Sequence, residues 1–196
     1  VIVSNCVISK SNRGISIQIR DGGSVENVTY SNIIIETRRF CPDWWGTAEP
    51  IVLTTFNRDE NTKSGSIKNI RFFNVTAKGE NGVLIHGNAD NYIEDITFEN
   101  CSICLTKTSK WDCGLYDLRP CLDWGVEKYD NSAFFIRYAK NVLIEKTKTS
   151  WGNLCDEYKH AIDAAETENL ELIRFSGKAV SSEFEDIKLD NVRLVK

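Results

Sequence analysis

The chain repeats a short pattern of alternating apolar and polar positions. The unit reads apolar, any, Asn or Asp, apolar, any, apolar, any, Asn, apolar, and its clear copies are "VENVTYSNI", "IKNIRFFNV" and "IEDITFENC". Looser copies begin at Ala139, Thr167 and Phe184, and the opening "VIVSNC" fits the end of the same unit. Apolar residues at every second position are typical of a strand with one buried face. The repeat therefore predicts a series of similar short strands.

The spacing of the closing Asn favours a parallel solenoid. This residue recurs at Asn5, Asn32, Asn74, Asn100 and Asn191, and the first four are 27, 42 and 26 residues apart. Units of about 26 residues with insertions, lacking helical periodicity, predict an all-β fold: a right-handed parallel β-helix of about seven coils. Stacked Asn side chains can hydrogen-bond along a ladder, and Asn tolerates a left-handed backbone. Because each unit buries its apolar face only against its neighbours, residues 1–196 are expected to form one domain.

A second strand follows the unit in most coils, and three of the connections before it are long. The second strands are expected at 14–19, 50–55, 82–87 and 133–138, with a weaker one at 160–165. The long insertions span 36–49, 105–132 and 149–159, and they hold all five tryptophans, at positions 44, 45, 111, 124 and 151. All three insertions enter at the same corner of the coil, so they should project from one edge. Insertions gathered in this way often mark a binding face.

Composition and charge exclude some partners. The 196 residues are 41% hydrophobic and 27% charged, with a net charge of −4, which argues against a nucleic-acid partner. No run of 18 apolar residues is present, so no membrane partner is expected. The chain contains no Met and opens in the middle of the repeat, which indicates the C-terminal part of a longer chain. Oligomeric state is left open.

The cysteines give a weaker signal. Seven are present, and their spacing fits no zinc template, so no metal site is expected. Cys113 and Cys121 flank "GLYDLRP" and could pin that loop in an oxidising compartment. The odd count leans slightly towards a reducing cytoplasm, and secretion from a bacterium stays open.

The insertions and the outward positions of the second strands supply the candidate site. Aromatic rings beside carboxylates and arginines suit carbohydrate recognition, because sugar C–H faces stack on indoles while charged groups bind hydroxyls. The candidate substrate-binding residues are Arg20, Trp44, Trp45, Glu49, His86, Asp117, Arg119, Arg137 and Trp151. The carboxylates available for hydrolysis, which sequence alone cannot pair, are Asp43, Glu49, Asp112, Asp117, Asp123, Glu127, Asp156 and Glu157.

Several candidates also have a structural interpretation. Trp44 and Trp45 would cap a coil edge instead of binding sugar, and His86 would be an ordinary surface residue. Arg20 and Asp21 precede two glycines and would fix a turn as an ion pair. In "YDLRP", Asp117 and Arg119 would hydrogen-bond their own loop.

Longer stretches resemble a known family. "NCVISKSNRGISIQIRDGGSVENVTYSNIIIETR", "DWWGTAEPI", "YDLRP" and "SWGNLCDEYKHAIDA" are similar to the C-terminal half of glycoside hydrolase family 28-like bacterial proteins, relatives of polygalacturonases in the pectin lyase-like superfamily. The resemblance covers nearly the whole chain. It implies an inverting hydrolase of galacturonan-type or related plant polysaccharides that uses no metal or other cofactor, with this chain supplying part of the substrate groove.

The chain also departs from that family. The Asp-Asp and Gly-His-Gly motifs of the family are absent, and the resemblance places the family's catalytic residues, including those of its Asn-x-Asp motif, before Val1. Ser16 and Gln18 stand where the family has the Arg and Lys that hold the substrate carboxylate, and Arg20 is the nearest substitute. The alternatives are a non-catalytic glycan-binding or degenerate β-helix and, with less support, a polysaccharide lyase, which would need clustered carboxylates for calcium.

Overall fold

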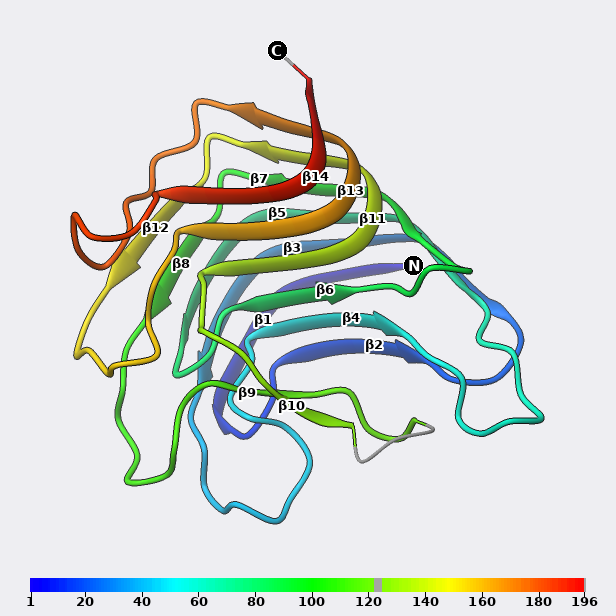
Figure 1. Cartoon of the computed structure of the whole chain (residues 1–196), viewed down its shortest axis with the longest axis horizontal. Helices are drawn as coiled ribbons and strands as arrows, with labels where there is room; N and C mark the ends of the chain where they lie inside the picture. Colours follow the sequence, from blue (N-terminus) through cyan, green and yellow to red (C-terminus); the bar gives the residue numbers. More distant parts are fainter. Residues whose placement is uncertain (122–124, 196) are drawn as a thin grey trace.

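The alternating repeat forms long strands that pair in parallel in one curved sheet (Figure 1). The computed structural model describes residues 1–121 and 125–195, so Asp123 and Trp124 of the candidate sets lie outside the described residues. The repeat strands are β1 (Ile2–Ser11), β3 (Ser24–Thr37), β5 (Ser66–Gly79), β7 (Ile93–Glu99), β11 (Phe134–Glu145), β13 (Ile162–Ile173) and β14 (Ile187–Val195). Within the described ranges every regular element is a strand, which confirms the all-β prediction.

The second strands stack on one another as predicted. They are β2 (Ile15–Ile19), β4 (Ile51–Thr55) and β6 (Val83–His86), and β6 pairs with the first residues of β11. Strand β11 bends at Tyr138, whose φ is 48°: residues before the bend pair with β6, and those after it pair with β7. Strands β8 (Ser102–Leu105) and β12 (Lys148–Trp151) follow β7 and β11 in the chain. Strand β8 lies between β5 and β12 and pairs with both. This parallel, curled arrangement fits a β-helix.

The core lies inside the curve and is built from the alternate residues of the strands. Ile33, Ile35 and Val75 are fully buried or nearly so. Rings from successive coils also stack, with centroids 5.2 Å apart for Tyr30 and Phe72 and 4.7 Å apart for Phe72 and Phe98. No helix in the described part of the chain has the length and apolar character needed to cross a membrane.

The predicted Asn ladder is present on the outside of the coils. The Nδ2 of Asn32 donates to Oδ1 of Asn5 at 3.1 Å, Asn74 donates to Asn32 at 2.8 Å, and Asn100 donates to Asn74 at 3.3 Å. All four residues have φ between 53° and 56°, where Asn is among the few residues tolerated without large strain. Each Asn thus adopts the turn conformation at a corner of its coil and forms a hydrogen bond with the neighbouring coil.

A second ladder follows the other Asn/Asp position of the repeat. Asn69 donates to Asn27 at 2.6 Å, Asn141 to Asp95 at 2.8 Å, and Asn169 to Asn141 at 2.9 Å. These residues also have positive φ. Both polar positions of the repeat therefore mark turns between strands.

The assignment of Asn191 to the first ladder was wrong. Its amide donates to Glu166 at 2.6 Å, and strand β14 pairs Ile187 with Ile162 and Asp190 with Ala165. The last copy of the repeat therefore occupies the position of a second strand. The alternation of "IKLDNV" fits either strand of a coil, so the pattern alone could not distinguish them.

Candidate functional site

The three long insertions meet at one edge, as the sequence predicts (Figure 1). The guanidinium of Arg39 donates to the carbonyl of Asp112 at 3.0 Å, and the indole N–H of Trp111 donates to the carbonyl of Phe40 at 3.1 Å. Residues 106–121 and 125–133 are joined to residues 152–161 by backbone bonds from Lys107 to Asn153 and from Asn131 to Glu157, at 2.8 and 2.7 Å. These segments, together with residues 38–50, form what we call the loop edge.

The loop edge covers the outward face of the second strands. Val52, Leu84 and Phe135 point outward from β4, β6 and β11, and they form a second buried cluster with Tyr116 and Leu118. The latter two belong to the long insertion, where β9 (Leu115–Asp117) pairs antiparallel with β10 (Val126–Lys128). No local pattern in the sequence predicts this cover. The outward faces of these strands are therefore enclosed rather than open to solvent.

A network of four charges, in which both carboxylates are buried, holds the first insertion against the second. Arg13, which sequence analysis missed, lies with Nη2 3.4 Å from both Oε1 of Glu49 and Oδ2 of Asp117. Arg119 donates from Nε to Oδ1 of Asp117 at 2.8 Å, so the prediction that these two bond within their own loop is confirmed. Neither carboxylate side chain has exposed surface. A role for Glu49, Asp117 or Arg119 in binding substrate stays a prediction.

The network favours the ionised form of Asp117. Burial is the largest single influence and opposes ionisation, but hydrogen bonds from Arg119 and the Gly46 N–H, with the charge of Arg13, hold the pKa of Asp117 below its usual value. Its carboxylate raises the pKa of Arg119 through the same hydrogen bond. The arrangement is thus a fully paired set of charges whose carboxylates are held as hydrogen-bond acceptors.

Trp44 and Trp45 project from a loop whose backbone is held by hydrogen bonds to neighbouring segments. Their side chains are 69% and 49% exposed. The N–H of Gly46 donates to Asp117 at 2.6 Å, and the carbonyls of Trp44 and Trp45 accept from Arg119 and Asn12, both at 3.3 Å. Large exposed rings on a fixed backbone are unusual, because indole surface is normally covered. The exposure argues against edge capping, and sugar binding by Trp44 and Trp45 stays a prediction.

The loop approaches its neighbour closely at Gly46. Its φ is 93°, and a Cβ there would lie 2.9 Å from the carbonyl oxygen of Asn12. Only glycine combines this backbone conformation with so close a contact. The "DWWG" sequence therefore places two tryptophans directly before the residue that anchors their loop.

Trp45 lines a cleft of about 380 Å³ with cationic groups on its walls. The lining residues are Gln18, Ile19, Arg20, Asp21, Gly22, Trp45, Arg58 and Pro120. The expected ion pair between Arg20 and Asp21 is not formed, because Asp21 pairs with Arg58 at 2.7 Å. Both of those side chains are about half exposed. Among the described lining residues, Asp21 supplies the single carboxylate.

Arg20 is the buried cation of this cleft. It is 4% exposed and donates to Oγ1 of Thr54 at 2.9 Å and to the carbonyl of Leu118 at 2.7 Å, while its Nε has no hydrogen-bond partner. Burial lowers the pKa of Arg20 to about 10, so the side chain stays charged at neutral pH.

His86, Arg137 and Trp151 do not line the cleft. His86 is buried between the rings of Phe56 and Phe135, and Nδ1 must carry its hydrogen because it donates to the Gly87 carbonyl at 2.7 Å. The expectation that His86 is an ordinary surface residue was therefore wrong. Burial lowers its pKa to about 4, with a contribution from the charge of Arg137. His86 is thus neutral at pH 7.

The other two residues make contacts within the protein. Arg137 pairs with Asp163 at 2.7 Å and lies 3.8 Å from the centre of the Phe135 ring. The Trp151 indole donates to the Lys178 carbonyl at 2.8 Å. Sugar binding by His86, Arg137 or Trp151 stays a prediction.

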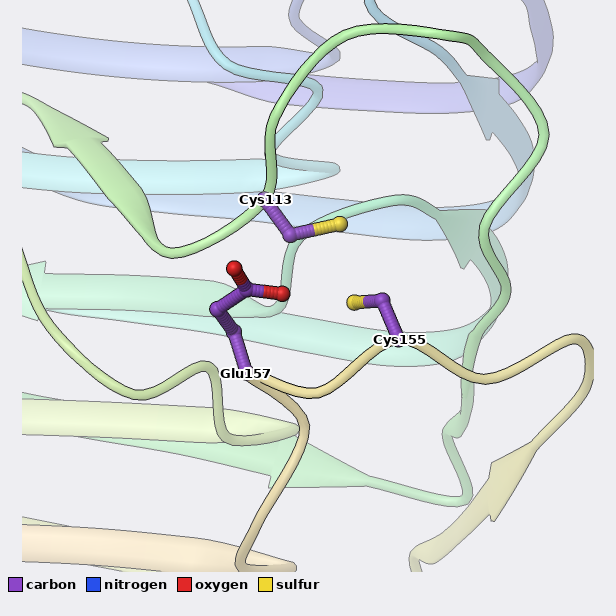
Figure 2. A group of neighbouring side chains, drawn as sticks. All are labelled: Cys113, Cys155 and Glu157. Atoms are coloured by element: carbon purple, nitrogen blue, oxygen red, sulfur yellow. The ribbon is translucent and has the colours of Figure 1, made fainter.

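Cys113 forms no disulfide; its thiol lies beside Cys155 and Glu157 (Figure 2). The hydrogen bond to Cys155, burial and the nearby negative groups raise the pKa of Cys113. The same hydrogen bond lowers the pKa of Cys155, because Cys113 donates to its sulfur. The idea that Cys113 is bonded to Cys121 was wrong, since the Cys113 thiol faces a different loop.

Comparison with known proteins places few limits on the function. No protein-family model matches the chain, and no curated protein matches it. Among solved structures, the chain is similar to the crystal structure of a candidate glycosyl hydrolase from Parabacteroides merdae. The two are 11% identical with a TM-score of 0.38, and the match covers 92% of this chain and 83% of the other. A likeness of this size identifies neither the family nor the activity.

Proposed function

We propose that this chain is the substrate-binding part of a polysaccharide-acting protein of the glycoside hydrolase type, and that it binds an acidic glycan at the loop edge. The observation that carries the proposal is the cleft in which exposed Trp45 stands beside Arg20 and Arg58. The scaffold is the right-handed parallel β-helix of about seven coils expected from the repeat. Within this fold the site combines Trp45 and Pro120 from two insertions with residues 18–22, in β2 and the turn after it, and with Arg58.

The lining groups suit a sugar that carries a carboxylate. The C–H face of a sugar ring stacks on Trp45, while the half-exposed guanidinium of Arg58 exchanges its bond to Asp21 for one to the sugar carboxylate. Arg20 contributes a fixed positive charge from a buried position. A uronate polymer of the galacturonan type has both features, an apolar ring face and one carboxylate per residue.

The chemistry of hydrolysis requires groups beyond this cleft. An inverting glycosidase needs two carboxyl groups about 6.5–9.5 Å apart. Among the described residues, the cleft offers Asp21, and the nearby Glu49 and Asp117 are tied to Arg13 and Arg119. In our proposal the catalytic aspartates therefore come from sequence outside this chain, where the family resemblance puts them.

The same observation favours a second candidate, a glycan-binding β-helix without catalysis. The two candidates share the cleft and differ only in whether a carboxylate pair is supplied from outside the chain. Reducing-sugar assays on the longer protein distinguish them. Robust hydrolysis of polygalacturonate by residues 1–196 alone would show that the catalytic pair had been placed wrongly.

Calorimetric titration with oligogalacturonates and with neutral oligosaccharides of equal length tests the binding proposal. Acidic oligomers should bind more tightly, and Trp45→Ala should weaken binding at least about tenfold, or ~1.4 kcal/mol, through loss of the stacking surface. Phe73→Ala is the matched control, because Phe73 is 44% exposed and lies on β5 outside the cleft. Arg58→Gln should weaken acidic oligomers only, with Arg193→Gln as its control. Equal affinity for both kinds of oligomer, or unchanged affinity in Trp45→Ala, would contradict the proposal.

A further inference from the structure

Three metal-binding side chains converge between two insertions of the loop edge. Cys113 comes from the segment 106–133, whereas Cys155 and Glu157 come from the segment 152–161. Figure 2 shows the two sulfurs turned towards each other, with the Glu157 carboxylate beside them. The two sulfurs and the carboxylate oxygen all lie within 4.8 Å of one another. Cys113 is buried, and Cys155 is half-buried.

We propose that Cys113, Cys155 and Glu157 bind a zinc ion, with water as the fourth ligand. Tetrahedral zinc with bonds of about 2.3 Å to sulfur and about 2.1 Å to oxygen needs ligand atoms about 3.5–3.8 Å apart. The observed group requires contraction by about 1 Å or less to reach that geometry. Two thiolates select a soft or borderline ion, since calcium and magnesium prefer sets of oxygen ligands.

The backbone around the site holds the ligands in place. The side-chain carbonyl of Asn131 accepts from the Gly114 N–H at 2.7 Å, and the Asn131 N–H donates to the Glu157 carbonyl, also at 2.7 Å. One residue therefore fixes the chain next to Cys113 and the chain at Glu157. The Tyr158 N–H also closes a turn onto the Cys155 carbonyl at 3.2 Å. Ligands fixed by such contacts lose little conformational freedom when a metal binds.

Gly114 makes room for the carboxylate. Its φ is 73°, and a Cβ at this position would lie 2.8 Å from Cγ of Glu157. Any other residue would push the Glu157 side chain away from the sulfurs. The close packing of Gly114 against Glu157 is a feature that a pair of thiols alone would not require. It supports a site of three ligands rather than a cysteine pair destined for a disulfide.

Charge around the site is partly balanced. Two thiolates and a carboxylate would leave one excess negative charge around a zinc ion, and the ammonium of Lys107 lies close enough to act on Cys113. Lys107 is held by Glu80 at 3.2 Å and by the carbonyl of Ser109 at 2.6 Å. The sequence did not reveal the site because its ligands come from two insertions, so no zinc spacing template applies.

Zinc uptake by the reduced, full chain tests the proposal. The chain is titrated with Zn²⁺ against a chromophoric chelator, and cobalt is substituted to detect the charge-transfer absorption of thiolate ligands. We expect one Zn²⁺ per chain, with affinity reduced at least about tenfold in Cys155→Ser and in Glu157→Gln. Cys104→Ser is the matched control, because this thiol is also half-buried but lies on β8, and it should keep full affinity.

Two results would overturn the proposal: no stoichiometric uptake by the reduced chain, or unchanged affinity in both ligand variants. Glu157→Gln keeps the inference testable if Cys155→Ser fails to fold, because it retains the size of the side chain. Zinc binding is independent of the proposed glycan site, so glycan titrations with metal-free protein report the two separately.

Discussion

The Asn ladders and the loop edge hold the backbone between strands in place in two different ways. On the ladder side, each corner of a coil uses the same residue type, positive φ and a hydrogen bond to the equivalent residue of the next coil, as in Asn5, Asn32 and Asn74. At the loop edge the contacts do not recur from coil to coil. Ion pairs between distant segments join Arg13, Glu49, Asp117 and Arg119. The first arrangement is repeated along the molecule, and the second is built for one place.

The difference predicts how far the effect of a substitution spreads in each region. A ladder residue contributes mainly to the two coils that it joins, so its loss should be local and moderate. A buried carboxylate of the network serves several partners at once, and its removal leaves other charges without compensation. Substitutions at the loop edge should therefore cost more than substitutions in a ladder, although the two ladders together have more members.

The largest expected effect is that of Asp117→Asn. The substitution leaves Arg119 unpaired and removes a partner of Arg13 and of the Gly46 N–H, so the free energy of unfolding should fall by about 3–5 kcal/mol. Urea denaturation followed by tryptophan fluorescence measures the loss. Asp21→Asn is the control, because its pair with Arg58 is exposed and its removal should leave stability near that of the wild type. Equal small losses in both variants would show that the network does not hold the edge.

Acidification should weaken the covered strands next to the loop edge through His86. Its pKa is about 4 in the folded protein and about 6.5 when unfolded, so the unfolded chain takes up the proton first as the pH falls. Stability should therefore decline from about pH 6.5 to about pH 4, by roughly 3 kcal/mol in total. Urea denaturation at pH 7 and pH 4.5 measures the decline, and His86→Gln should remove it. The carboxylate of Asp117 acts at lower pH, because its stabilisation is lost only below about pH 3.9.

The smallest expected effect is that of a single ladder residue. Asn32→Ala loses the hydrogen bonds to Asn5 and from Asn74 and places Ala at a φ of 54°, so it should cost about 1–2 kcal/mol. Asn32→Gly separates the two causes, since glycine tolerates the conformation but lacks the amide. We expect the glycine variant to fall between the wild type and the alanine variant. If alanine at position 32 is tolerated without loss, the ladder is a consequence of the corners and not a source of stability.

The same contrast explains how much could be predicted from sequence. The fold can be predicted from the repeat, because the strand pattern and the Asn or Asp at the corners recur along the chain. Each copy is a weak signal, but the copies agree with one another. The ladder through Asn5, Asn32, Asn74 and Asn100 was found on this basis. The error at Asn191 arose where the pattern was short enough to fit either strand of a coil.

The sequence predicts where the loop edge lies but not the contacts within it. Insertion length and tryptophan content indicated the edge, yet neither the role of Arg13 nor the cover formed by Tyr116 and Leu118 carries a local signal. Such contacts join residues about 100 positions apart, such as Arg13 and Asp117. Their partners are chosen by the three-dimensional path of the insertions. The three ligands of the proposed zinc site were missed for the same reason.

The cover over Val52, Leu84 and Phe135 gives the molecule two separate interiors. The larger one is shared by all the coils, whereas the smaller one is closed by a single insertion. A change in that insertion, at Tyr116 or Leu118 for example, alters the outer compartment while the coil interior keeps its packing. Damage to the outer compartment therefore need not spread to the interior that the coils share.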